Sequence, residues 1–173
     1  LSEAFERTRQ LLPGRNVFVV TDSSLAACGH LGTLMGGRNV PSFVIEPAGE
    51  ASKNMATVKC ILEAMEAASL GRDTVIIALG GGTVGDMAGF AAAIFKRGVP
   101  VVHIPTTTVA QADSAIGGKT GVDSTLSKNA FGAFHHPVAV FVDVETLRTL
   151  DRRQYIAGLA ESVKHGLIAD AAY

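Results

Sequence analysis

A glycine-rich segment at residues 80–86 has the composition and the setting of a ligand-binding turn. It reads Gly-Gly-Gly-Thr-Val-Gly-Asp, follows an apolar β-branched run at residues 74–79, and precedes an alanine-rich helical pattern that we expect to begin at about Met87. A strand, a glycine turn and a helix N-terminus together present unpaired backbone N–H groups and a positive dipole end, which suit a pyrophosphate. Gly80, Gly82 and Gly85 match the dinucleotide fingerprint in spacing. The motif indicates a nucleotide site, although such glycines can also be purely conformational.

The second candidate segment, Gly49 to Lys53, follows another apolar run and opens a helical pattern. We expect it at the carboxyl end of a neighbouring strand, where open α/β sheets bind ligands. Glu50 can accept hydrogen bonds from ribose hydroxyls and Lys53 can reach a phosphate; a helix cap with a solvated lysine is the alternative. The acidic residue usually found ~20 positions after the fingerprint is missing, because the strand pattern at residues 101–104 lies there. We therefore predict a site that differs from the standard Rossmann type.

Several ionisable residues have two interpretations. Glu161 and Lys164 are three apart on a predicted helix, where a surface ion pair is the common arrangement. Glu161 and His165 are four apart and could both contact one zinc ion. Asp86 follows the glycine turn and could serve only as a helix cap.

The remaining histidines favour structural roles. His135 and His136 stand before Pro137, and we expect a turn in which one ring is satisfied by hydrogen bonds. His103 falls in a predicted buried strand, which favours a core histidine over a metal ligand.

The elements that must position these residues alternate between strand and helix patterns. We expect strands at residues 17–21, 42–46, 74–79, 99–104 and 139–142, several of them apolar at consecutive positions, and a helix at residues 54–69. This rhythm predicts an α/β fold: an open, mostly parallel sheet with flanking helices, a Rossmann-like variant. Residues 111–132 break the rhythm, and we expect a long functional loop there. From Arg152 the pattern is helical to Tyr173 without a closing Gly or Pro, so we expect a chain that is cut short.

Composition excludes several classes of function. The chain has 173 residues, 15 basic against 16 acidic, and a net charge of −1, so no electrostatic footprint for nucleic acid or an anionic membrane is present. The longest apolar run, residues 87–95, is far shorter than the ~20 residues of a bilayer span, and the N-terminal segment does not resemble a signal peptide. Cys28 and Cys60 lack metal-ligand spacing, and we expect buried free thiols. A cytoplasmic protein with a small anionic ligand is the expectation.

Six motifs in register closely resemble 3-dehydroquinate synthase, a member of the sugar phosphate cyclase superfamily. They are Pro-Thr-Thr at 105–107, Gln-Ala-Asp-Ser at 111–114, Gly-Gly-Lys-Thr-Gly at 117–121, Lys-Asn at 128–129, Thr-Leu-Arg-Thr-Leu at 146–150 and Ala-Gly-Leu-Ala-Glu-Ser-Val-Lys at 157–164. The resemblance runs from about Gly49 to the C-terminus. Before Gly49 only the strand–helix rhythm is similar.

The resemblance implies an NAD site, a substrate site and a metal site. The NAD site would use Glu50, Lys53, Gly82, Thr83, Val84, Gly85, Asp86, Thr106, Thr107, Lys119, Lys128, Thr146, Leu147, Arg148 and Thr149. The substrate site would use Asp113, Lys119, Asn129 and Lys164, with Arg97 reaching the partner subunit's site across a homodimer. Glu161 would bind one divalent metal, zinc or cobalt, together with two histidines of a C-terminal helical domain that we do not find here beyond its first helix.

The family reaction, as the resemblance implies it, closes a phosphorylated seven-carbon sugar acid into a ring in the shikimate pathway. An alcohol is first oxidised by NAD. The phosphate group then helps to remove the neighbouring proton and is itself eliminated. The ketone is reduced again, and an aldol addition closes the carbocycle. The family usually has His-Pro and a glycine where this chain has Ser124, Thr125 and Ser127, and tyrosine at His165. Since the lysine and asparagine after these loop positions are retained, we expect the chemistry to survive.

Two domains and three alternative functions follow from this comparison. We expect an NAD-binding α/β domain at residues 1–150 and the truncated start of the helical domain at 151–173. The alternatives are another cyclase such as a valiolone or deoxyinosose synthase, an iron-type NAD-dependent polyol dehydrogenase, and an NAD-binding module without turnover. Release of NADH would favour the dehydrogenase, because the cyclase recycles its cofactor.

Overall fold

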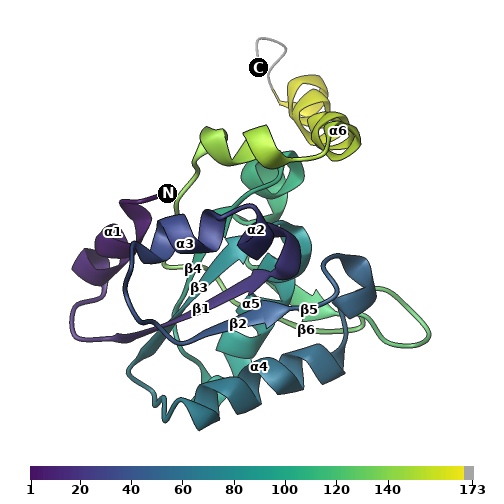
Figure 1. The fold of residues 1–173 in the computed structure, drawn as a ribbon. Coiled ribbons are helices and arrows are strands. Elements are labelled where there is room, and N and C mark those ends of the chain that lie inside the picture. The colour runs from purple at the N-terminus through teal and green to yellow at the C-terminus, as the bar shows by residue number, and fades with distance from the viewer. Residues whose placement is uncertain (170–173) are drawn as a thin grey trace.

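A five-stranded parallel sheet forms the centre of the molecule (Figure 1). The structure, a computed structural model, describes residues 1–169. The strands lie in the order β2-β1-β3-β4-β7, and their bounds are Ser42–Ile45, Asn16–Asp22, Thr74–Gly80, Val101–Pro105 and Ala139–Val140. All five predicted strands are thus confirmed, although β4 begins two residues later than expected and β7 is two residues shorter. The predicted fold class, an open parallel sheet with flanking helices, is also confirmed.

Helices cover both faces of the sheet, which explains why the central strands are apolar at consecutive positions. Phe18 and Ile76 point to the face covered by α4 (Met55–Ala67) and α5 (Gly82–Ile94). Val19 and Ile77, one residue further along each strand, point to the face covered by α1 (Ala4–Leu11) and α3 (His30–Met35). Figure 1 shows α1 and α3 on one side of the sheet and α4 on the other. Alternation along a strand therefore fills two separate cores.

Two of the helices that flank the sheet, α2 (Ser23–Ala27) and α4, begin where the sequence provides a side-chain cap. The side chain of Asn54 accepts a hydrogen bond from Thr57 N at 3.1 Å at the start of α4. Asp22 accepts from Leu25 N at 3.0 Å at the start of α2. Such caps satisfy backbone donors that the first helical turn leaves unpaired. The predicted helix at residues 54–69 is confirmed as α4.

The segment at residues 111–132, expected to be a long loop, has its own structure. After one π-helical turn, η3 (Ala110–Ser114), β5 (Lys119–Val122) pairs antiparallel with β6 (Phe131–Phe134), and Thr120 lies opposite Ala133. The pair packs on α5, where a Cβ atom on Gly89 would lie 2.5 Å from Thr120 Cγ2. The prediction of a long loop missed this strand pair, because the two four-residue strands are too short and too rich in glycine for their pattern to be recognised.

Three short helical segments and one long terminal helix complete the described part of the chain. They are η1 (Glu50–Ser52), η2 (Phe95–Arg97), η4 (Val144–Thr149) and the terminal helix α6 (Arg152–Ile168). The expected helix after residue 151 is confirmed, and its predicted continuation at 170–173 lies outside the described residues. Within residues 1–169, no helix combines the length and apolar character needed to cross a membrane.

The cysteine prediction was half wrong. Cys28 and Cys60 are free thiols, as expected, but both are exposed. Cys60 is two residues, about 200° of helical rotation, from Val58, which belongs to the buried face of α4 together with Ile61 and Met65. The apolar stripe therefore turns Cys60 outward.

Strand order determines where a ligand can bind. From β1 the chain adds β2 on one side and then β3 on the other, so the connections after β1 and β3 diverge. Such a switch point leaves a crevice at the carboxyl ends of the strands. The segments that follow β2, β3, β4 and β7 contain nearly all the residues that sequence analysis assigned to a site.

Candidate nucleotide and substrate site

A cavity of about 450 Å³ lies beside the glycine turn, between α5 and the β5–β6 pair. It is lined by Asp86, Asp113, Ser114, Gly117, Lys119, Thr120, Gly121, Asn129, Ala130, Gly132, Ala133 and Phe134. Three of the predicted substrate residues, Asp113, Lys119 and Asn129, thus converge on one cavity with the predicted NAD residue Asp86. They come from four separate segments of the chain.

Helix α5 begins within the glycine turn, earlier than predicted. The helix starts at Gly82 instead of Met87, and its N-cap is Gly81, which has no side chain to cap it. The first N–H groups of the helix have no intrahelical partner, so they are available to an anion. A Cβ atom on Gly81 would lie 2.8 Å from Thr107 Cγ2, and Thr106 N donates to Gly80 O at 3.0 Å. The predicted NAD residues Thr106 and Thr107 therefore border the turn.

Ser114 was not assigned to a site by sequence analysis, yet it lies at the turn. Its hydroxyl Oγ is buried without a hydrogen-bond partner among residues 1–169, and a Cβ atom on Gly82 would lie 3.1 Å from it. An unpaired buried hydroxyl is costly unless a ligand or water satisfies it. Its position directly after Asp113 is the signal that could have identified it.

Gly85 lies where α5 packs against the sheet. A Cβ atom there would lie 3.1 Å from Nδ1 of His103 on β4. The glycine is needed where α5 packs on the sheet, which is the role of the third glycine in dinucleotide-binding turns. Val84, next to it, is buried in the core. Gly85 and Val84 therefore pack the turn against the sheet and the core.

Lys53, Asp86 and Asn129 form a charged cluster at one wall of the cavity. Lys53 Nζ lies 2.7 Å from Asp86 Oδ2 and donates to Asn129 Oδ1 at 2.6 Å, while Lys53 is only 6% exposed. Burial raises the pKa of Asp86, and the hydrogen bond from Lys53 opposes that rise. Asp86 is thus no helix cap, because α5 begins at Gly82 and Asp86 lies inside the helix.

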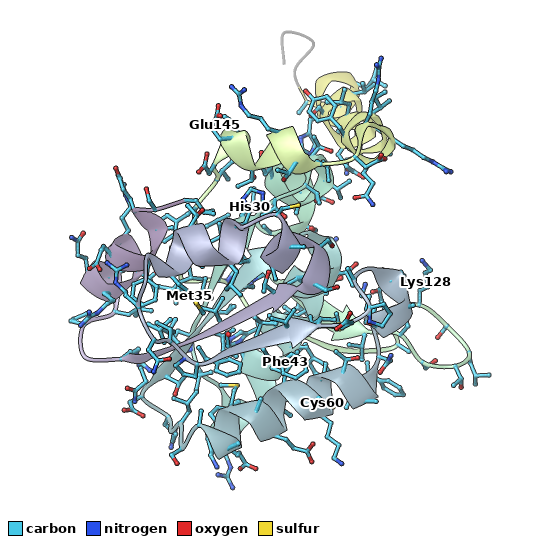
Figure 2. The ribbon with its side chains drawn as sticks, viewed as in Figure 1. His30, Met35, Phe43, Cys60, Lys128 and Glu145 are labelled. Carbon is cyan, nitrogen blue, oxygen red and sulfur yellow. The ribbon has the colours of Figure 1, made fainter. Side chains whose placement is uncertain are left out.

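Glu50 forms a second, more exposed cluster at the same edge. Lys128 Nζ lies 3.1 Å from Glu50 Oε1, and Thr83 Oγ1 donates to Glu50 Oε2 at 3.2 Å. The hydrogen bond to Glu50 raises the pKa of Lys128. Figure 2 shows Lys128 on the loop beside the short η1 helix. Three further predicted NAD residues, Thr83 and Asp86 of α5 and Lys128 of the β5–β6 loop, are therefore grouped around Lys53 and Glu50.

Glu161 and Lys164 on α6 form an ion pair. The hydrogen bond from Lys164 is the main cause of a lowered Glu161 pKa, with smaller contributions from His165 and Lys119. The same pairing raises the pKa of Lys164, with a small contribution from Asp113. The ion pair expected on the helix is confirmed, and its electrostatic contact with Lys119 and Asp113 places it near the cavity.

The predicted NAD residues at 146–149 lie on η4 at the same edge of the sheet but outside the cavity lining. Gln111 Nε2 donates to Pro105 O and Asp143 O, both at 3.1 Å, and to Thr146 Oγ1 at 3.3 Å. Gln111 belongs to one of the family motifs but had no predicted role, and in the structure it links η3 to η4. Thr146 is buried, and Thr149 Oγ1 lies 2.7 Å from His30 Nε2 between η4 and α3 (Figure 2). Leu147 is half-buried and Arg148 is exposed.

Arg97 lies far from this edge. It belongs to η2, at the opposite end of α5 from the glycine turn, and adopts a left-handed conformation with φ +72°. It does not line the cavity of its own chain.

The histidine predictions agree with the structure. His103 is buried, and burial, with a smaller effect of His135, lowers its pKa to about 4. A ring nitrogen of His135 lies 2.9 Å from Val99 O, as expected of a histidine satisfied by hydrogen bonding. Within residues 1–169, no three side chains of His, Cys, Asp or Glu come together to hold a metal.

Solved structures define the class to which this fold belongs. The chain resembles 2-epi-5-epi-valiolone synthase from Streptomyces hygroscopicus subsp. jinggangensis 5008, solved with NAD+ and Zn2+, at 35% identity and a TM-score of 0.84 over 95% of this chain and 47% of that one. It resembles 2-deoxy-scyllo-inosose synthase, complexed with carbaglucose-6-phosphate, NAD+ and Co2+, at 32% identity and a TM-score of 0.82 over 95% and 47%. The chain thus has the fold of the N-terminal part of the sugar phosphate cyclases. An iron containing alcohol dehydrogenase at 20% identity and a TM-score of 0.74 shares the fold alone.

Sequence relatives specify the family. The protein family described as "3-dehydroquinate synthase N-terminal" matches residues 43–157 of this chain. A 3-dehydroquinate synthase from Geobacter metallireducens is 47% identical over 165 residues, which are 94% of this chain and 46% of that protein. The chain belongs to the 3-dehydroquinate synthase family, and it spans about half the length of the curated relatives it matches.

Proposed function

We propose that this chain is the cofactor-binding part of a 3-dehydroquinate synthase, which converts 3-deoxy-D-arabino-heptulosonate 7-phosphate to 3-dehydroquinate and phosphate for aromatic amino acid biosynthesis. The observation that carries the proposal is the convergence of Asp113, Lys119 and Asn129 on a cavity that adjoins an uncapped glycine turn. Family membership supports the substrate. We further propose that residues 1–150 form the α/β domain and that α6 begins the next one.

The glycine turn fits NAD. Free N–H groups at Gly82 and Thr83 suit a pyrophosphate, and the unpaired Ser114 hydroxyl beside Gly82 can donate to a cofactor oxygen. Glu50, held near the turn by Thr83 and Lys128, can accept from ribose hydroxyls once those bonds rearrange. When bound, NAD would accept a hydride from the substrate alcohol and return it, so no second redox partner is needed.

The polar residues around the cavity can orient a phosphorylated substrate. Lys119 is exposed at the cavity, where its ammonium can reach the phosphate dianion. Asn129 can donate a hydrogen bond from its amide while Lys53 occupies its oxygen. Asp113 and Lys164 are close enough to influence one another electrostatically, and we assign them to the hydroxyl and carboxylate end of the substrate.

The described residues supply one metal ligand and no complete metal site. Glu161 offers a hard carboxylate oxygen, but catalytic zinc needs about three protein ligands. We therefore propose that this chain contributes the Glu161 carboxylate to the metal site. Glu161 would pair with Lys164 until a zinc or cobalt ion replaces Lys164 as its partner. Arg97, remote from its own cavity, suits the role across a homodimer that the resemblance implies. A cytoplasmic location stays a prediction.

Two measurements test the function. Titration calorimetry of the chain with NAD should give binding, whereas phosphate release from the heptulosonate phosphate should require a protein of the relatives' full length that contains this chain. Phosphate release by the chain alone would contradict the assignment of the metal site. Net NADH formation on an alcohol by the longer protein would favour a polyol dehydrogenase, and turnover of a different sugar phosphate would favour another cyclase.

A further inference from the structure

Lys53 is the one predicted NAD residue whose charged group is both buried and already paired on two sides. Its ammonium lies 2.7 Å from the carboxylate of Asp86, in the first turns of α5, and 2.6 Å from the amide oxygen of Asn129, on the β5–β6 loop. A lysine has three donors, and these two short contacts use two of them. Lys128, by contrast, has a side chain that is 75% exposed and can move toward a ligand.

The backbone of the same residue holds the start of that loop. Asp123 N donates to Lys53 O at 3.0 Å, and Asp123 Oδ1 accepts from Asn129 N at 2.7 Å. Asn129 has φ +52°, a left-handed conformation that side chains other than glycine adopt only with support. The loop at residues 123–129 is therefore tied to residue 53 at both of its ends, by a main-chain bond at one and by the ammonium at the other.

We infer that Lys53 is a positioning residue: it couples the cofactor turn to the substrate loop by bridging Asp86 and Asn129, and it does not bind phosphate itself. This inference rests on the proposed function of the cavity and deepens it. Withdrawing the ammonium toward a ligand would leave the half-buried Asp86 carboxylate without its partner, which is expensive for a charge with little access to water. It would also release the Asn129 oxygen that fixes the orientation of the amide facing the cavity.

A positioning role for Lys53 has a consequence in the ligand-free protein that a phosphate-binding role would not have. Loop amides that are hydrogen-bonded, among them Asp123, Leu126, Ser127 and Asn129, should be protected from hydrogen exchange as long as Lys53 holds the loop. Lys53→Met removes the charge and keeps much of the chain length. We expect exchange across residues 123–129 to become at least tenfold faster in this variant.

Two further variants control the exchange experiment. Lys59→Met removes a lysine from α4 whose side chain is 73% exposed, and exchange in the loop should stay unchanged. Lys53→Arg keeps the charge and two or more donors, and it should restore part of the protection. If Lys53→Met does not fold, Lys53→Met combined with Asp86→Asn removes the stranded carboxylate. Unchanged loop exchange in a folded Lys53→Met variant would overturn the inference.

A double-mutant cycle separates positioning from direct binding. In the longer, NAD-loaded protein we would measure the affinity for a phosphonate analogue of the heptulosonate phosphate with Lys53→Met, Asn129→Ala and the pair. We expect Lys53→Met to weaken binding tenfold or more when Asn129 is present and less than twofold when it is absent. Equal losses in both backgrounds would show a direct contact and overturn the inference. If the unmutated protein binds neither NAD nor the analogue, the proposed function fails, and the exchange experiment still decides whether Lys53 holds the loop.

Discussion

Gly158 on α6 packs directly against Thr108, the third residue after β4, with no room for a side chain. A Cβ atom at residue 158 would overlap Thr108 Oγ1, and the same hydroxyl lies 3.1 Å from Tyr155 O and 3.3 Å from Gln154 O. Gly158 is also the one buried residue of α6 within the described chain. This contact fixes the second turn of the helix on the sheet edge and thereby places Glu161, three residues later, near the cavity.

Gly158→Ala should therefore displace α6 and cost about 1–3 kcal/mol, as overpacked sites do. In the longer protein we expect lower metal content with NAD affinity nearly unchanged, measured by elemental analysis and calorimetry. Gly166→Ala is the matched control on the same helix, since a Cβ atom there meets nothing within 4 Å. It should leave the metal content unchanged and stabilise the helix by up to about 1 kcal/mol. Equal effects of the two substitutions would contradict the positioning role of Gly158.

Gly85→Val should destabilise the fold as a whole. The new side chain must displace the buried ring of His103, so we expect a loss of about 1–3 kcal/mol in the free energy of unfolding, measured by urea denaturation, with weaker NAD binding as a result. Gly32→Ala, where a Cβ atom meets nothing within 4 Å, should cost little. The loss should shrink when His103→Ala makes room. A variant with full stability and no NAD affinity would instead place Gly85 at the pyrophosphate.

His103 should make the protein less stable in mild acid. Its pKa is about 4 in the folded chain, below the usual 6.5 because of burial, so the unfolded chain binds more protons between these values. The free energy of unfolding should then fall as the pH decreases from about 6.5 to about 4, by about 3 kcal/mol in total. Denaturation series at several pH values would measure the slope. With His103→Gln this part of the slope should vanish; a slope that persists would assign it to other groups.

Glu161→Gln should remove or weaken the metal in the longer protein and reduce turnover far more than NAD affinity. The amide keeps the shape of the side chain but loses the charge that a divalent ion needs. Metal content and phosphate release would be measured on the same preparation. Normal values of both would mean that Glu161 is only the partner of Lys164.

Lys119→Ala should weaken phosphate-bearing analogues much more than their dephosphorylated counterparts, by about 1.5–3 kcal/mol for a lost charge-assisted hydrogen bond. Both dissociation constants must be measured at one salt concentration, because screening changes with ionic strength. Lys59→Met serves as a matched control for the loss of a solvated lysine. An unchanged ratio of the two constants would leave Asn129 and Arg97 as the phosphate candidates.

The sequence by itself determined the elements whose signals are local. Five strands, the α4 stripe and the glycine turn between β3 and α5 were predicted because hydrophobic period and turn chemistry act over a few residues. The family followed from motifs in register. Even the exposure of Cys60 was encoded in the α4 stripe, two residues from Val58, although the general tendency of cysteine to be buried led to the opposite prediction.

Only the tertiary structure decided how those elements share a site. Lys53 and Asn129 are 76 residues apart in the sequence. They meet because the segments that follow β2 and β3 lie beside the β5–β6 pair, and the pairing of β5 with β6 has no strong local signal in the sequence. The same is true of His103 under Gly85 and of Thr108 under Gly158. Sequence patterns report what each segment prefers, whereas close packing and burial of charge depend on which segments become neighbours. The sequence pattern around Lys53 thus allowed either a phosphate ligand or a solvated lysine, whereas in the fold Lys53 is a buried bridge between Asp86 and Asn129.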